Sequence, residues 1–216
     1  MCSLGRIFEF VRPADVMASI LTNENLKAVV ECLLQTFANR DELHILERVC
    51  YAIEKLADWC KSQSAVSLSP YLKDFIEALL KVGFHPVESS ARVRVRVAAL
   101  EAINGLVRAA SPDSLDLVVQ LIPYFSQKLS ESLRVQQPSD SDERIAETQA
   151  LVCGCLTVIF CRLSLSEGHR IPLAHCGGEV FRLLTEVLQA NGSESGVLEE
   201  AMITFSALVS SGANLD

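Results

Sequence analysis

The chain has 216 residues, of which 50% are hydrophobic and 6% aromatic, and its formal net charge is −8. This apolar content excludes a globally disordered chain, and ten Gly with seven Pro exclude a collagen-like one. The acidic balance disfavours nucleic acid as a partner, because phosphate contacts require a basic surface. We expect no signal peptide, because Arg6 and Glu9 interrupt the first apolar run. We expect no membrane insertion either, since no uninterrupted apolar run approaches ~18–20 residues.

The negative charge is distributed unevenly along the chain. Residues 1–108 contain 13 basic and 13 acidic residues, whereas residues 109–216 contain 6 basic and 14 acidic residues. A negative surface field attracts basic partners. Solubility is the simpler explanation of a charge excess that has no assigned place in the fold.

The eight cysteines contain no CxxC pair, so their spacing predicts no zinc site. Cys153 and Cys155 form a CxC without a second half, and His175 is adjacent to Cys176. Most of the cysteines lie within apolar runs. We therefore predict buried free thiols and a reducing compartment.

Motifs for enzyme chemistry are missing from the sequence. It has no Gly-rich phosphate loop, no GxSxG and no HExxH. His175 and Cys176 are adjacent, but neighbouring residues on a helix diverge by about 100°. Asp140, Asp142 and Glu143 lack the spacing and the glycine of an EF-hand. We predict a protein that is not an enzyme and has no cofactor and no metal.

Apolar residues recur at helical spacing along the whole chain, for example Leu46, Cys50, Ile53 and Ala57. Similar stripes run from Leu72 to Val82, from Ile145 to Leu163, and through Leu198, Met202, Phe205 and Val209. The predicted helices span 2–11, 24–38, 42–60, 70–82, 90–109, 113–135, 142–163, 176–190 and 195–210.

These helices are predicted to form a leading helix (1–11) and four helical pairs (24–60, 70–109, 113–163 and 176–210). The second helices of successive pairs start about 48, 52 and 53 residues apart. This period is close to that of HEAT or armadillo units. Because a single pair cannot bury its own apolar stripe, the pairs are expected to stack into an all-α solenoid. We predict one HEAT-repeat array over 1–216, cut from a longer solenoid.

Residues 91–97 alternate strictly between apolar and polar, which is a strand pattern. They continue into the strong helix former 98–103, and a lone strand would have no pairing partner. We predict a helix here. The three arginines of this stretch are interpreted as a solvated first turn or two, and an anion site is the alternative.

The helix predicted over 42–60 has a second stripe about 120° from its apolar one. Glu47, Tyr51, Glu54 and Asp58 share it. Carboxylates pair with Lys and Arg, and an aromatic ring stacks on a guanidinium, so this line suits a basic peptide. An ordinary solvated face, partly neutralised by Lys55, explains the pattern equally well.

The same helix carries a family resemblance. Residues 49–57 (VCYAIEKLA) resemble the VCWAxxxLAE motif of the importin-β (karyopherin-β) family of nuclear import receptors. Four other segments are similar to family motifs in the same order: 4–9 (LGRIFE), 99–103 (ALEAI), 141–145 (SDERI) and 197–202 (VLEEAM).

The resemblance implies a HEAT superhelix whose second helices line an inner surface. There the family binds the basic segment of importin-α or basic cargo. Its outer helices accept phenylalanine-glycine repeats of nucleoporins, and the full-length receptors bind the GTPase Ran. The implied localisation is the cytoplasm, the nucleus and the nuclear pore. The alternative is a structural HEAT scaffold in an unrelated assembly.

Only some inner-surface positions match the family. Tyr51 stands where the family often has a tryptophan that stacks on the basic peptide, and Glu101 coincides with a family glutamate. The stripe on the 42–60 helix and the resemblance together predict a protein-binding site formed by Glu47, Tyr51, Glu54, Asp58 and Glu101. Arg94 and Arg108 would oppose a basic ligand.

Overall fold

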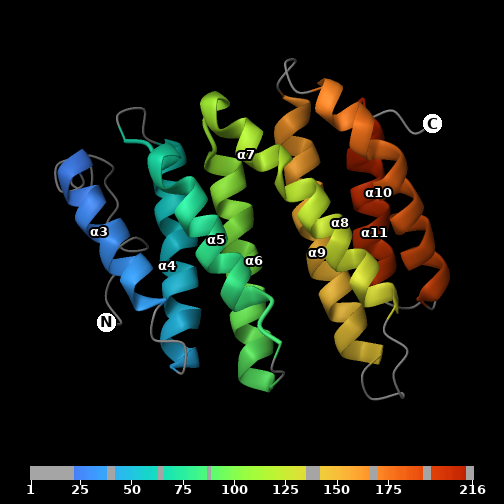
Figure 1. Cartoon of the computed structure of the whole chain (residues 1–216), viewed down its shortest axis with the longest axis horizontal. Coiled ribbons are helices and arrows are strands. Elements are labelled where there is room, and N and C mark those ends of the chain that lie inside the picture. Colours follow the sequence, from blue (N-terminus) through green and yellow to red (C-terminus); the bar gives the residue numbers. More distant parts are fainter. Residues whose placement is uncertain are drawn as a thin grey trace. The chain divides into compact units, whose positions relative to one another are not determined.

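The computed structural model describes residues 22–37, 42–62, 66–86, 89–134, 142–165, 170–191 and 196–212 (Figure 1). All regular structure in these ranges is helical, as predicted. The leading helix predicted over 2–11 lies outside them.

The α-helices are α3 (Asn23–Thr36), α4 (Leu43–Ser62), α5 (Leu72–Gly83), α6 (Ser90–Ala109), α7 (Leu115–Val119), α8 (Leu121–Arg134), α9 (Asp142–Ser164), α10 (Arg170–Ala190) and α11 (Gly196–Ser210). Two 3₁₀ turns, η1 (Ser69–Tyr71) and η2 (Pro112–Ser114), precede α5 and α7. The pairs Ser69-Pro70 and Ser111-Pro112 therefore lie at the start of 3₁₀ turns. The helices predicted from residues 70 and 113 begin at Leu72 and Leu115.

The chain divides into two compact units, residues 1–114 and residues 115–216. The amino-terminal unit contains α3 to α6, and the carboxy-terminal unit contains α7 to α11. Each unit is described by itself.

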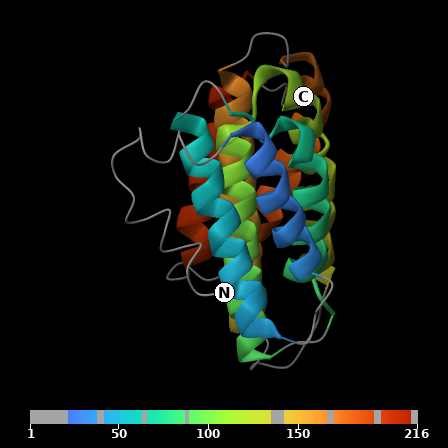
Figure 2. The same ribbon diagram turned by 90° about the vertical axis from the view of Figure 1, so that its left-hand side faces the viewer.

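In the amino-terminal unit, α4 lies along α6, while α5 packs on α6 and α3 contacts both α4 and α5 (Figure 2). Leu46, Cys50 and Ile53 of α4 are fully buried, as are Phe75 of α5 and Ile103 of α6. The apolar stripe predicted for α4 is thus its core-facing side.

The alternating residues 91–97 are helical, as predicted, and lie in α6. Ser89 is the N-cap, and its hydroxyl accepts a hydrogen bond from the Arg92 backbone N–H at 3.2 Å. Arg96 is buried, and its Nε donates to the carbonyl oxygen of Gly83 at 3.1 Å. This carbonyl ends α5, where the helix dipole favours a cation. Tertiary contacts thus account for one arginine of the apparent strand pattern.

In the carboxy-terminal unit, α9 lies along α11, α8 packs on α9, and α10 packs on α11 and α8. A chain of amide and hydroxyl groups ties three of these helices together. Gln149 is buried on α9; its Nε2 donates to Ser132 Oγ at 3.2 Å, and its Oε1 accepts from Asn191 Nδ2 at 2.8 Å. Both polar ends of the Gln149 side chain are therefore satisfied.

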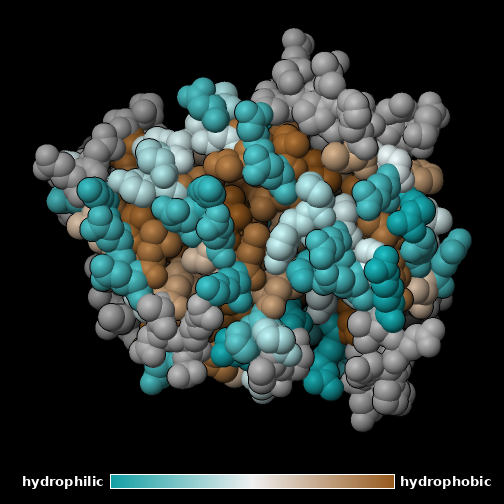
Figure 3. Space-filling model, viewed as in Figure 1, coloured by the Kyte–Doolittle hydropathy of each residue, from teal (hydrophilic) through white to brown (hydrophobic). Residues whose placement is uncertain are grey.

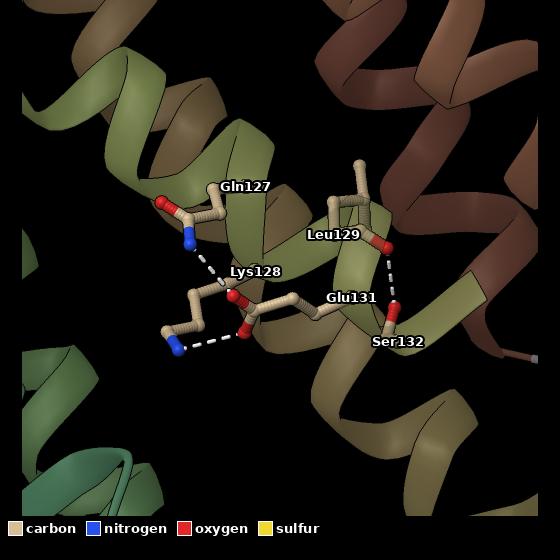
Figure 4. Close-up of polar contacts among 5 residues, drawn as sticks. All are labelled: Gln127, Lys128, Leu129, Glu131 and Ser132. Carbon is tan, nitrogen blue, oxygen red and sulfur yellow. Dashed lines mark hydrogen bonds and ion pairs between the residues drawn. The ribbon is translucent and has the colours of Figure 1, made fainter. Parts of the chain in front are cut away.

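The exposed side of α8 is held by polar contacts within the helix (Figure 4). The Glu131 carboxylate accepts hydrogen bonds from Lys128 Nζ at 2.8 Å and from Gln127 Nε2 at 2.7 Å. These bonds stabilise the charged carboxylate and lower the pKa of Glu131. Lys128 Nζ also lies 5.7 Å from the centre of the Tyr124 ring.

The single helix predicted over 113–135 is wrong, because the structure breaks it at Gln120 between α7 and α8. Pro123 explains the break. It has no backbone N–H to donate to the carbonyl of Val119, and its ring clashes with that carbonyl in a continuous helix.

The predicted start of the next helix at residue 176 is also wrong, since α10 begins at Arg170. The predicted start at residue 176 follows from the sequence pattern, in which Pro172 is typical of a helix break and Gly177-Gly178 of a helix-entry turn. Pro172 lies in the first turn of α10, where backbone N–H groups have no partner in the helix and proline is tolerated. The two glycines lie inside the helix.

The core face predicted for the last helix is wrong by about one residue. Met202 is 54% exposed and Val209 is 49% exposed on α11, whereas Ala201, Thr204 and Leu208 are buried. This helix is apolar on most of its circumference, so several apolar stripes fit the helical period. The predicted stripe was the one with the larger side chains. Thr204 instead faces α9, where its hydroxyl donates a hydrogen bond to the Cys153 carbonyl at 2.9 Å.

The stretch Glu143–Ser164 in α9 is long and apolar enough to cross a membrane. It is not an uninterrupted apolar run, because it contains Gln149 and Thr157. Val152, Leu156 and Phe160 on this helix are buried in the protein core. Core helices commonly have this composition.

The prediction of buried thiols is confirmed for Cys50, Cys60, Cys153 and Cys155 and is wrong for Cys32 and Cys161, which are exposed. Cys176 is half-buried. Burial raises the pKa of Cys50, Cys60 and Cys153 to about 12, so these thiols stay protonated at neutral pH.

This difference predicts selective alkylation. With iodoacetamide at pH 8, Cys32 and Cys161 should react in the native chain, while Cys50, Cys60 and Cys153 should react only after unfolding. Peptide mass mapping before and after addition of denaturant measures the order. Similar labelling of both groups in the native chain would contradict the packing described here.

Candidate protein-binding surface

The four predicted site residues of α4 share one side of the helix, as their spacing requires. We call Glu47, Tyr51, Glu54 and Asp58 the acidic line. Asp58 is exposed and the other three are half-buried. The half-burial arises because the acidic line lies at the edge where α4 meets α6.

Two contacts define this edge. Glu47 Oε2 lies 3.5 Å from Arg94 Nε on α6. Further along, Gly105 of α6 approaches Glu54 so closely that an added Cβ would lie 3.3 Å from Glu54 Cγ and 3.5 Å from Glu54 Cα. Residue numbers rise together in the two contacts, so α4 and α6 run in the same direction.

Lys55 bridges two members of the acidic line. Its Nζ lies 5.0 Å from the centre of the Tyr51 ring and 3.3 Å from Glu54 Oε1. The ring and the carboxylate therefore bind one ammonium group together, through a cation–π contact and a charged hydrogen bond. The Lys55 side chain is only 28% exposed.

The three α6 residues considered for the binding surface, Glu101, Arg94 and Arg108, differ in exposure and in partners. Glu101 is exposed on α6, and Arg108 is half-buried in the last turn. Arg94, predicted to oppose a basic ligand, instead pairs with Glu47, although its side chain is 61% exposed. The surface thus mixes exposed carboxylates with carboxylates that already pair with a cation.

Sequence reasoning missed the pairing of Glu47 with Arg94 and the role of Gly105. The first depends on the register between helices that are 47 positions apart in the chain. The second had a weak signal, since a glycine in a helix interior is costly unless a close approach requires it. A single sequence does not show that Arg94 pairs with Glu47 or that Gly105 lies against Glu54.

The structure does not support a role for Cys176 as a catalytic nucleophile. Burial, and then the neighbouring charge of Glu179, raise the pKa of the Cys176 thiol, which disfavours a thiolate nucleophile. The side chain of His175 is not among those described. Within the described ranges, no group of three His, Cys, Asp or Glu side chains is placed to hold a metal ion.

The close approach at Gly105 predicts different effects of alanine at two interior glycines. At Gly154 an added Cβ meets only Glu200 Oε2, at 3.6 Å, so Gly154→Ala should stabilise the chain by about 0.5–1 kcal/mol through its higher helix propensity. Gly105→Ala should stabilise it less or destabilise it, because the Cβ crowds Glu54. Urea denaturation compares the two, and equal stabilisation would refute the tight contact.

Comparison with known proteins places this arrangement in a family. The model of importin subunit beta-1-like proteins, which describes TPR repeats, matches residues 28–214. Importin subunit beta-1 of Arabidopsis thaliana is 30% identical over 208 residues, which is 95% of this chain and 23% of the relative. The chain therefore spans about a quarter of the length of that relative. No solved structure gives a significant match.

The repeat period also fits a helical-repeat fold. The helices α4, α6, α9 and α11 begin at residues 43, 90, 142 and 196, so successive starts are 47, 52 and 54 residues apart. Such a period is typical of two-helix repeats with long loops. The chain is an all-α solenoid protein and belongs to the importin subunit beta-1-like family.

Proposed function

We propose that this chain acts as a segment of a nuclear transport receptor and binds basic segments of importin-α or of cargo along the acidic line. The family supports the transport role. The observation that carries the binding site is the Lys55 ammonium, held 5.0 Å from the Tyr51 ring and 3.3 Å from Glu54 Oε1. This contact supports the proposal, because the ring and the carboxylate lie close enough together to bind one cation.

Asp58 and Glu101 extend the proposed site. Both are exposed, on α4 and α6 respectively, so they can pair with further basic residues of an extended peptide. Exposed charge pairs contribute little singly, and affinity is expected from several contacts with strong dependence on salt.

The outer helices are the proposed place of contact with nucleoporin repeats. Figure 3 shows apolar side chains between α3 and α5 on the face seen in Figure 1, flanked by hydrophilic ones. Phe37 and Phe75 are buried and thus belong to the core, while Phe84 is half-buried. We further propose shuttling between cytoplasm and nucleus through the nuclear pore, with Ran acting on the longer protein.

Titration with an arginine-rich adaptor peptide at low salt tests the proposed site. Tyr51→Ala combined with Glu54→Lys should weaken binding about tenfold or more, because a charged contact becomes repulsive. Asp58→Lys, at an exposed position that leaves the packing intact, should also weaken it. Fluorescence anisotropy gives the dissociation constants.

Glu77→Lys is the matched control, since Glu77 is an exposed carboxylate on α5 of the same unit. An equal loss of affinity with Glu77→Lys, or unchanged binding in the site variants, would count against the acidic line. Recovery of importin-α or nucleoporins from cell extract by the immobilised chain favours transport. Their absence favours the alternative, a structural scaffold.

A further inference from the structure

Lys55 is held against its own helix by an aromatic ring and a carboxylate, as Lys128 of α8 is held by Tyr124 and Glu131. An unpaired lysine on an exposed helix face extends into water, because its ammonium is strongly hydrated. Here the side chain lies over Tyr51, four residues earlier, and ends at the carboxylate of Glu54. Its neighbours Arg48 and Lys61 on the same helix are exposed.

Lys55 uses the two groups that a basic ligand would need. A ligand cation over the Tyr51 ring competes for the position where Lys55 Nζ lies, 5.0 Å from the ring centre. The same ligand would seek Glu54 Oε1, which is 3.3 Å from that Nζ. Arg94 pairs with the Glu47 carboxylate in a comparable way, but the Arg94 side chain is more exposed.

We propose that Lys55 is an internal competitor, which occupies the cation position of the acidic line and is displaced when a basic peptide binds. This inference rests on the proposed function and adds to it how the site is regulated. The free energy of binding is the difference between the ligand's contacts and those that Lys55 gives up. An incoming arginine is favoured over a lysine, because a guanidinium stacks on the ring and pairs with two oxygens.

The first test removes the competitor. Lys55→Met keeps a long stem and a good helix former but cannot bind the ring or the carboxylate as a cation. The 216-residue chain with this substitution should bind an arginine-rich peptide about three- to fivefold more tightly than the chain with Lys61→Met. Lys61→Met removes the same charge from the same helix and so controls for the general field.

The second test observes Lys55 directly in the wild-type chain. Protons of its terminal methylene groups should be shifted upfield by the ring current of Tyr51 in nuclear magnetic resonance spectra. Titration with the peptide should return them toward the values of an exposed lysine. Unmoved Lys55 signals at saturating peptide would overturn the proposal even if Lys55→Met failed to fold.

The outcomes separate this proposal from the proposed function. Binding that is weakened by Asp58→Lys but is equal in the two methionine variants would overturn the internal competitor alone. Absence of binding in the wild-type chain and in Lys55→Met would overturn both proposals. Binding seen only after Lys55→Met would support both, with displacement as the limiting cost.

Discussion

The close approach of α4 and α6 is the constraint on which the amino-terminal unit depends. Gly105 has no side chain, so α6 can lie against the backbone of Glu54, and this fixes the register of the two helices. The same register brings Arg94 to Glu47. In the carboxy-terminal unit, the hydroxyl of Thr204 on α11 lies 2.9 Å from the Cys153 carbonyl of α9. In both units, contact between second helices of successive pairs uses small residues.

This contact between helices determines which charges a partner can reach. A helix considered alone would offer three carboxylates and a tyrosine to a ligand. Packing along α6 half-buries Glu47, Tyr51 and Glu54, while Asp58 stays exposed. Cations of the chain already pair with Glu47 and Glu54. In the proposed binding of a basic segment, a ligand cation would therefore replace a cation of the chain, and the affinity would be smaller than the number of carboxylates suggests.

Much of the fold follows from local pattern. The stripe through Leu46, Cys50 and Ile53 predicted the core face of α4, and the helix formers after residue 97 correctly outweighed the alternation of 91–97. The errors arose at prolines, whose effect on a helix depends on their position in it. Pro123 and Pro172 are each the third residue of a helix, α8 and α10, where the missing N–H has no partner within the helix. Pro123 was predicted inside one longer helix, and Pro172 before the start of the next.

The candidate site was predictable only within one helix. Spacing alone places Glu47, Tyr51, Glu54 and Asp58 on one side of α4. Their pairing with Arg94 and the approach of Gly105 depend on the register between α4 and α6, which no periodicity specifies. The prediction of the core face of α11 was wrong for a related reason. Thr204 is buried against α9, and its hydropathy does not indicate this contact.

Site-specific photo-crosslinking tests the central claim most directly, namely that the ring position on α4 contacts the basic ligand. A photoreactive phenylalanine analogue would replace Tyr51 in one sample and Tyr71, which lies in η1 of the same unit, in another. The account predicts a crosslink to an arginine-rich importin-α peptide from position 51 that excess unlabelled peptide removes. Equal crosslinking from both positions, or none from position 51, would contradict it.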